Sequence, residues 1–183
     1  LKDFYSRYGV IKELNADKPQ YELDSQFKQA LYPVIYSIIG KKYSGKTELS
    51  KVLNRLHGIK LFDFEEFKNG EDFKGEKPKT EILVTKFIEK LRKIEDPRIL
   101  IENFPENKEQ YNFFIKNCKP IEKIYYLNAD NSSCLERLNN IPVNSPNYVD
   151  CTKLNKLLLD FEKKEDFIKF LKRQTVLLHP KDE

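Results

Sequence analysis

Short apolar runs rich in β-branched residues alternate along the chain with longer stretches in which apolar residues recur at helical spacing. Five runs have the length of strands: Val34–Ile39, Ile59–Phe64, Arg98–Phe104, Ile121–Ala129 and Thr175–His179. Helical patterns separate them, over Lys46–Leu56, Glu81–Ile94, Asn107–Cys118, Asp130–Asn140 and Cys151–Arg173, the last as one long helix or two short ones. This alternation predicts an α/β fold with a five-stranded parallel sheet and helices on both faces, a three-layer α/β/α arrangement.

Two segments do not follow the alternation. The stretch Glu65–Thr80 is charged and contains glycines, so we expect it to be too polar to join the core. Residues 1–32 read as an appendage: a short helix, a short strand over Gly9–Ala16, and a helix that Pro33 ends. The last helix carries apolar residues at helical spacing, namely Leu23, Phe27 and Leu31. We therefore divide the chain into an appendage, 1–32, and a domain, 33–183.

Composition narrows the classes of partner. The 183 residues are 39% hydrophobic and 34% charged, which is typical of a globular domain rather than a disordered chain. The net charge of +4 comes from 33 basic and 29 acidic residues that are interspersed, so no nucleic-acid partner is expected. The longest apolar runs have strand length, and the charged N-terminal stretch lacks a signal-peptide pattern, so no membrane association is expected either.

Cysteine usage indicates a reducing compartment. Cys118, Cys134 and Cys151 are odd in number and lack the spacing of a metal site, so reduced thiols and a cytoplasmic location are expected. The chain also has no Met, not even at position 1, which indicates an excerpt from a longer protein.

A glycine-rich motif follows the first predicted strand. Gly40, Gly45, Lys46 and Thr47 satisfy G-x-x-x-x-G-K-[ST], with a strand before the motif and a helix after it. In such a loop the glycines allow the backbone to wrap closely around phosphate oxygens, and the helix N-terminus points its N–H groups at the anion. Lys46 is then placed to reach the β- and γ-phosphates, and the Thr47 hydroxyl to ligate Mg²⁺.

Other residues of the loop modify this prediction. Lys41 and Lys42 add positive charge, while Tyr43 and Ser44 are bulkier than the small residues often found there and can narrow the site. The competing interpretation is that the loop is a structural relic that no longer binds phosphate.

A carboxylate at the end of a neighbouring strand is the second requirement of a Mg²⁺–phosphate site. Glu102, at the end of the third predicted strand, is placed to hold the water shell of the ion, and Asp63, after the second, is a weaker candidate. Glu102 is equally well interpreted as a solvated carboxylate at a strand end.

The segment from Glu102 to Gln110, "ENFPENKEQ", resembles the third-strand segment of the adenylate kinase and nucleoside monophosphate kinase family, D-G-F-P-R-x-x-x-Q. The strand and helix "IEKIYYLNADNSSCLERL" are similar to a later family segment and place Arg137 on its arginine. The resemblance covers residues 34–179. It implies Mg²⁺ with ATP on the glycine-rich loop, Arg137 beside the ATP adenine and phosphates, and AMP read by Gln110.

The departures from the family are equally informative. Glu106 stands where the family has a phosphate-binding arginine, Lys68 where it has another, and Leu157 where it has a catalytic one. The segment after Arg137 that matches the family's lid is short and contains no arginine, and Lys153 and Lys156 cannot form the same bidentate clamp. Because phosphoryl transfer depends on neutralising the moving group, the resemblance implies an impaired or inactive enzyme.

Three functions stay open at this point. The chain is a nucleotide-binding pseudokinase that acts as a scaffold with protein partners, an active kinase that uses Lys46 to stabilise phosphate, or a structural domain without nucleotide. Residues 1–32 resemble the end of another such domain, so they are either the tail of a preceding repeat or a segment that docks here and supplies an edge strand. Tandem proteins of this kind occur in cilia and flagella, so the resemblance implies an axonemal origin.

Overall fold

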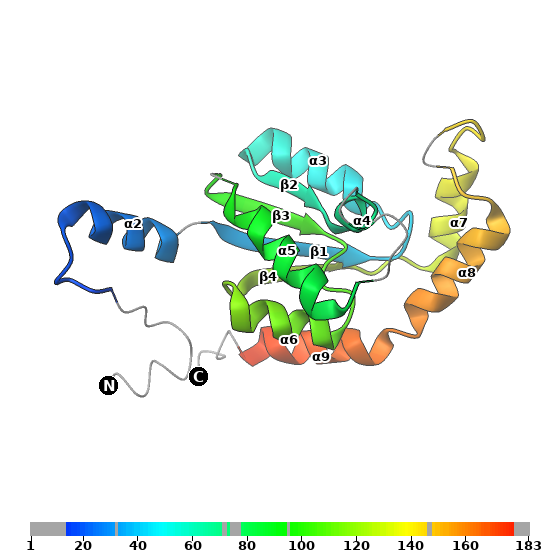
Figure 1. Cartoon of the computed structure of the whole chain (residues 1–183). Helices are drawn as coiled ribbons and strands as arrows, with labels where there is room; N and C mark the ends of the chain where they lie inside the picture. Colours follow the sequence, from blue (N-terminus) through cyan, green and yellow to red (C-terminus); the bar gives the residue numbers. More distant parts are fainter. Residues whose placement is uncertain are drawn as a thin grey trace, which may run out of the picture.

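The computed structural model describes residues 14–31, 33–70, 73, 78–94, 96–145 and 148–177. Its elements, in chain order, are α2 Gln20–Leu31, β1 Val34–Gly40, α3 Lys46–His57, β2 Lys60–Asp63, α4 Phe64–Lys68, α5 Thr80–Arg92, β3 Arg98–Glu102, α6 Lys108–Asn117, β4 Ile121–Leu127, α7 Asn131–Asn139, α8 Cys151–Glu162 and α9 Glu165–Leu177 (Figure 1). Strands and helices thus alternate as predicted. None of the helices in these ranges is long and apolar enough to cross a membrane.

The sheet has four strands, all parallel, in the order β2-β3-β1-β4. Its register brings the candidate residues to one edge, because Ile38 of β1 pairs with Glu102 of β3, and Glu102 pairs with Asp63 of β2. The carboxyl ends of three strands therefore meet where β1 runs out into the glycine-rich loop, which is where parallel α/β sheets hold their ligands.

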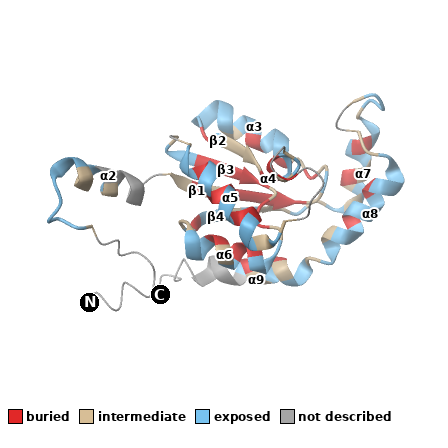
Figure 2. Ribbon diagram, in the orientation of Figure 1, coloured by how far each residue is buried: buried red, intermediate tan, exposed pale blue. Residues whose placement is uncertain are grey.

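The two faces of the sheet bury different side chains. On one face Ile38 and Leu100 pack with Ile59, and Leu53 of α3 lies against them. On the other face Ile35, Ile39, Ile99 and Ile101 join a larger cluster with residues of α4, α5, α6 and α9. Figure 2 shows the buried residues concentrated on the strands and on the sides of the helices that face them. Helices thus cover both faces, and the larger part of the core lies away from α3.

The charged stretch after β2 contradicts one prediction. Phe64 and Phe67 of α4, together with Phe73, are buried. The rings of Phe64 and Phe67 stack on each other, Phe73 packs edge-on against Phe67, and both α4 rings pack edge-on or tilted against Phe87 of α5. The prediction that Glu65–Thr80 is too polar for the core is therefore wrong at its phenylalanines. Burial of these large aromatic rings stabilises the fold, and the charged residues between them stay at the surface.

The predicted fifth strand is also wrong. Residues 175–177 form the last turn of α9, and residues 178 and 179 lie outside the described ranges. Ile168 and Leu171, three residues apart, are both buried in the larger core cluster, so packing of a helical face fixes this segment as a helix despite its β-branched residues. Of the predicted N-terminal strand, residues 14–16 are not in a strand and the rest is outside the described ranges, as is the helix expected before it.

Candidate functional site

The glycine-rich loop joins β1 to α3 at the carboxyl edge of the sheet. Gly45, the residue before α3, has φ 97° and ψ 10°, a left-handed conformation that glycine adopts without the steric cost of a side chain. Tyr43 has φ 60°, which is uncommon for a residue with a side chain. Such strained residues cluster at ligand-binding loops, where the surrounding structure holds them in place.

Gly40 is required by a close approach rather than by its backbone angles. A Cβ built on it would lie 2.8 Å from the carbonyl oxygen of Leu127 and 2.8 Å from Oγ of Ser44. The first residue of the loop therefore touches the end of β4, and only glycine leaves room for this contact.

Lys46 is buried under the loop, with a side chain that turns back toward β1. Its Nζ donates hydrogen bonds to the carbonyl oxygens of Gly40 and Lys41, at 2.8 Å each. Burial lowers the pKa of Lys46 to about 8, against the opposing effect of the Glu102 carboxylate. Within the described residues the ammonium is thus hydrogen-bonded to neutral oxygens, and an anion in the loop would be a stronger partner for it.

Thr47 and Glu102 form the second part of the site. The Thr47 hydroxyl donates to Oε2 of Glu102 at 3.0 Å, and Glu102 is buried at the end of β3. Asp63, the weaker candidate, is instead the N-cap of α4, where it accepts from the backbone N–H of Glu65, and Asn103 also donates to it. The Asp63 carboxylate thus serves to cap α4 and to accept from Asn103, whereas the Glu102 carboxylate is directed at Thr47 in the loop.

The oxygens of Thr47 and Glu102 suit a small hard cation. Among the described residues no cluster of three or more His, Cys, Asp or Glu side chains is arranged to hold a metal by itself. Two oxygens are too few to hold such an ion alone, so water or a bound phosphate would have to supply the other ligands.

Ser44 gives an independent indication of a ligand. It is 6% exposed, and its hydroxyl has no hydrogen-bond partner among the described residues. Ser44 lines an open depression of about 250 Å³ together with residues of the β4–α7 connection and Arg137. A buried hydroxyl without a partner costs free energy, which a polar ligand in this depression would recover.

Arg137 lies over the loop. From α7 its Nη1 donates to the carbonyl oxygen of Tyr43 at 2.9 Å, and the same nitrogen is 3.6 Å from the position of a Cβ on Gly45. The structure therefore brings Arg137 to the glycine-rich loop, although 92 positions separate it from Gly45 in the sequence.

Three polar contacts at the site were not predicted from the sequence. Lys41 Nζ donates to Oδ1 of Asn131 at 2.7 Å and lies 3.7 Å from Oε1 of Glu162, while Nδ2 of Asn131 donates to that same oxygen at 2.8 Å. These bonds tie the loop to the start of α7 and the end of α8. The sequence contains no signal for them, because polar residues so far apart are unrelated in any local pattern.

Gln110 belongs to a second polar cluster, near the start of α6. Its Oε1 accepts from the backbone N–H of Glu106 at 2.9 Å, and its Nε2 donates to Oε2 of the same residue at 3.0 Å. Oε1 of Glu106 lies 2.5 Å from Nζ of Lys68, which also pairs with Glu65 at 3.3 Å. Burial alone would lower the pKa of Lys68, but the hydrogen bond and charge of Glu106 outweigh it and raise the pKa. The side chains of this cluster thus satisfy one another.

The position that matches the family's catalytic arginine, and the two lysines near it, lie on α8. Lys153, Lys156 and Leu157 are all exposed there.

The sequence matches neither the models of known protein families nor any curated protein to which it was compared. What is established is an α/β domain with a four-stranded parallel sheet and a glycine-rich loop at its carboxyl edge.

Proposed function

We propose that this chain is an adenylate kinase-like nucleotide-binding domain that holds ATP with Mg²⁺ and acts as a binding module in a larger assembly, with phosphoryl transfer slow or absent. Two neighbouring features carry the proposal: the Lys46 side chain is buried under the loop, and the Thr47 hydroxyl lies 3.0 Å from Oε2 of Glu102. The orphaned Ser44 hydroxyl beside them, which lacks a partner among the described residues, supports it.

Each residue has a role in this proposal. The backbone N–H groups of the loop and of the first turn of α3 bind phosphate oxygens, and Lys46 neutralises the charge of the terminal phosphates. Thr47 would ligate Mg²⁺, with Glu102 acting through the water shell, and Arg137 would lie along the nucleotide. The ion, when bound, neutralises part of the charge on the phosphates.

The second polar cluster argues against efficient transfer to AMP. The resemblance assigns Gln110 to the base of AMP, but both ends of its side-chain amide already bond Glu106. Glu106 puts a carboxylate where the family has a phosphate-binding arginine, and it also neutralises Lys68. After Arg137 the next arginine in the sequence is Arg173, so the lid segment and α8 supply none.

The role as a binding module in a larger assembly of similar domains is also part of the proposal. It is supported by the resemblance of residues 1–32 to the end of another such domain. An active kinase and a purely structural domain are the outcomes that would replace it.

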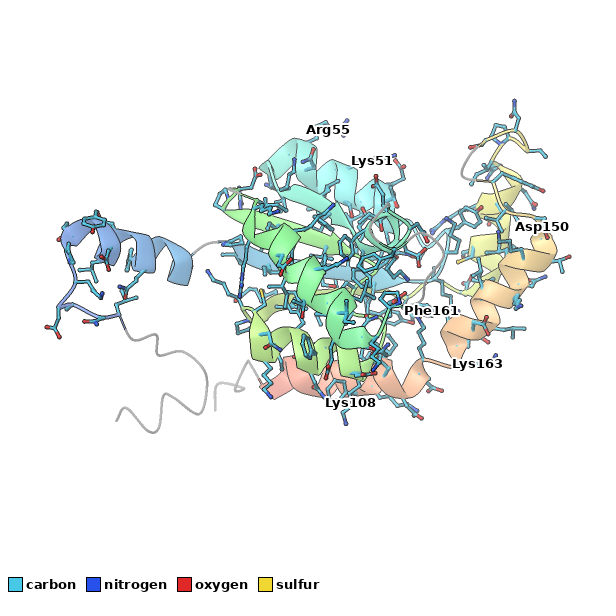
Figure 3. All side chains as sticks on the ribbon, viewed as in Figure 1. Lys51, Arg55, Lys108, Asp150, Phe161 and Lys163 are labelled. Carbon is cyan, nitrogen blue, oxygen red and sulfur yellow. The ribbon has the colours of Figure 1, made fainter. Side chains whose placement is uncertain are left out.

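The test is calorimetric titration with Mg·ATP, followed by addition of AMP and an assay for ADP. We expect binding that Lys46→Ala weakens by about 100-fold, since removing one partner of a buried charge contact costs roughly 2–5 kcal/mol. Lys51→Ala is the matched control, because Lys51 lies on the outer side of α3 with its amine in solvent (Figure 3). Its loss removes the same charge from the same helix and should leave the affinity unchanged.

The two alternatives give different results. ADP formed in the presence of AMP, and lost in Lys46→Ala, would identify an active kinase with lysines in place of arginines. No heat and no shift in the melting temperature with any nucleotide would identify a structural domain.

A further inference from the structure

An apolar groove lies between α3 and the face of the sheet formed by β1, β3 and β4. It has a volume of about 410 Å³ and is lined by Tyr36, Ile38, Leu49, Leu53, His57, Ile59, Arg98, Leu100 and Tyr125. Leu49 is 39% exposed and Tyr125 is 45% exposed, and the rings of Tyr36 and Tyr125 lie 6.4 Å apart along the open side. Within the described residues this face of the sheet is therefore covered by α3 alone, with large apolar side chains left in water.

The helix that precedes β1 carries a matching surface. In α2, Leu23 and Phe27 are four residues apart and so lie on one side of the helix. Phe27 is 52% exposed, and Figure 1 shows α2 (blue) extending away from the sheet at the amino end of β1. Tyr21, which is 72% exposed, lies two residues before Leu23 and hence on the opposite side.

The connection allows this helix to reach the groove. Only residues 32 and 33 separate α2 from β1, and links of 2–6 residues commonly join a helix to the strand on which it packs. The helix of 12 residues is about 18 Å long, and β1 of 7 residues is about 23 Å long, so α2 folded back along β1 would cover most of the strand.

Charge favours the same arrangement. Arg98 and His57 line the groove, and none of the lining residues is acidic. Glu22 and Asp24 stand on either side of Leu23 in α2, so they would face the rim of the groove when Leu23 packs into it. A helix of the same chain also has a far higher effective concentration at the groove than any separate molecule.

We propose that α2 closes onto this groove, with Phe27 and Leu23 packed against Tyr36, Leu49 and Tyr125, so that α2 covers the β1–β4 face beside α3. The structure presents the open arrangement, and the closed one removes the exposed aromatic residues of both surfaces from water. The occupant is α2 of the same chain, and the closure does not depend on nucleotide.

The chain has no tryptophan, so a single one can report on the helix. Phe27→Trp should show emission shifted to shorter wavelength and quenching by acrylamide reduced about threefold relative to Tyr21→Trp, whose indole points to solvent. In the Phe27→Trp background, Leu49→Lys should restore full quenching. Leu56→Lys is the matched control, since Leu56 is a more exposed leucine of α3 that does not line the groove.

Three results would overturn the proposal. Equal emission and quenching of the Phe27→Trp and Tyr21→Trp reporters would show that α2 stays in solvent. Release of the Phe27→Trp reporter by Leu56→Lys as readily as by Leu49→Lys would place α2 elsewhere. Protection of the same reporter only at protein concentrations where light scattering finds a dimer would show that the groove takes α2 of a second copy.

Discussion

The two polar clusters at the carboxyl edge of the sheet use similar groups in opposite ways. In the loop cluster, the described residues give the Lys46 ammonium only carbonyl oxygens as hydrogen-bond partners, and they give the buried Ser44 hydroxyl none. In the second cluster, Lys68, Glu106 and Gln110 are joined to one another by charge and hydrogen bonds.

The difference teaches which of the two can bind an anion at low cost. A buried cation without a paired counter-ion gains an interaction when phosphate arrives, whereas a paired one must first give up its carboxylate. The loop cluster can therefore bind an anion without breaking an ion pair, whereas in the second cluster the pairing of Lys68 with Glu106 competes with an anion. This contrast is what separates a nucleotide-binding domain from a working transferase in the proposal above.

After Lys46→Ala, the largest effect is expected from Gly40→Ala. The new Cβ would lie 2.8 Å from a backbone oxygen of β4 and from the Ser44 hydroxyl, so the loop must shift away from β4. We expect Mg·ATP affinity to fall by about 30-fold or more and the free energy of unfolding by about 1–3 kcal/mol, as in other overpacked sites. Titration calorimetry and denaturant unfolding measure the two quantities.

Gly58→Ala is the control for this substitution. Gly58 ends α3 in a left-handed conformation with φ 61°, and nothing among the described residues lies within 4 Å of a Cβ placed on it. Its replacement should cost about 1 kcal/mol of stability with no change in nucleotide affinity. If both variants bind Mg·ATP as the original chain does, the loop is not the binding site.

The next effect is a dependence of nucleotide affinity on pH. Burial lowers the pKa of Lys46 to about 8, so its ammonium is mostly charged at pH 7 and mostly neutral at pH 9. Affinity for Mg·ATP should therefore fall by about tenfold over this interval, if the ammonium is the group that binds phosphate. Lys46→Arg, which keeps its charge at both pH values, should bind with an affinity that does not change over the interval.

The stability of the free chain should follow the opposite trend. An unfolded lysine titrates near 10.5 and the folded Lys46 near 8, so between these values the unfolded state binds more protons. The contribution of Lys46 to the free energy of unfolding therefore rises as pH increases from about 8 to about 10.5. A difference between the original chain and Lys46→Arg that stays constant across this range would contradict the lowered pKa of Lys46.

Much of the fold was predictable because local pattern and packing agree in it. The strands β1 to β4 are apolar runs bounded by turns, and the glycine-rich motif fixed both the end of β1 and the start of α3. Two of the errors arose where local propensity and tertiary packing disagree. At Thr175 the β-branched residues favoured a strand, but α9 continues through it, and at Phe67 and Phe73 charged neighbours hid residues that pack into the core.

The site was predictable only as far as its motif extends. Lys46, Thr47 and Glu102 were found from their places after strands, and Arg137 from a resemblance. The bonds of Lys41 to Asn131 and Glu162 depend on how α7 and α8 pack, so no local pattern contains them. Likewise, the sequence places a carboxylate at Glu106, but only the structure gives Lys68 and Gln110 as its partners.

The smallest effect, and the sharpest test of the contrast between the clusters, comes from Glu106→Gln. This change removes the charge that pairs with Lys68 and keeps the size of the side chain. We expect the free energy of unfolding to fall by about 0.5–1 kcal/mol, as for a partly exposed ion pair, with Mg·ATP affinity unchanged within about twofold. AMP affinity should rise about threefold, because Lys68 becomes available to a phosphate.

Glu65→Gln, which removes the more exposed partner of Lys68, should change each quantity less. Thermal unfolding and titration with each nucleotide provide the measurements. A loss of Mg·ATP affinity in Glu106→Gln as large as in Gly40→Ala would mean that the two clusters form a single site.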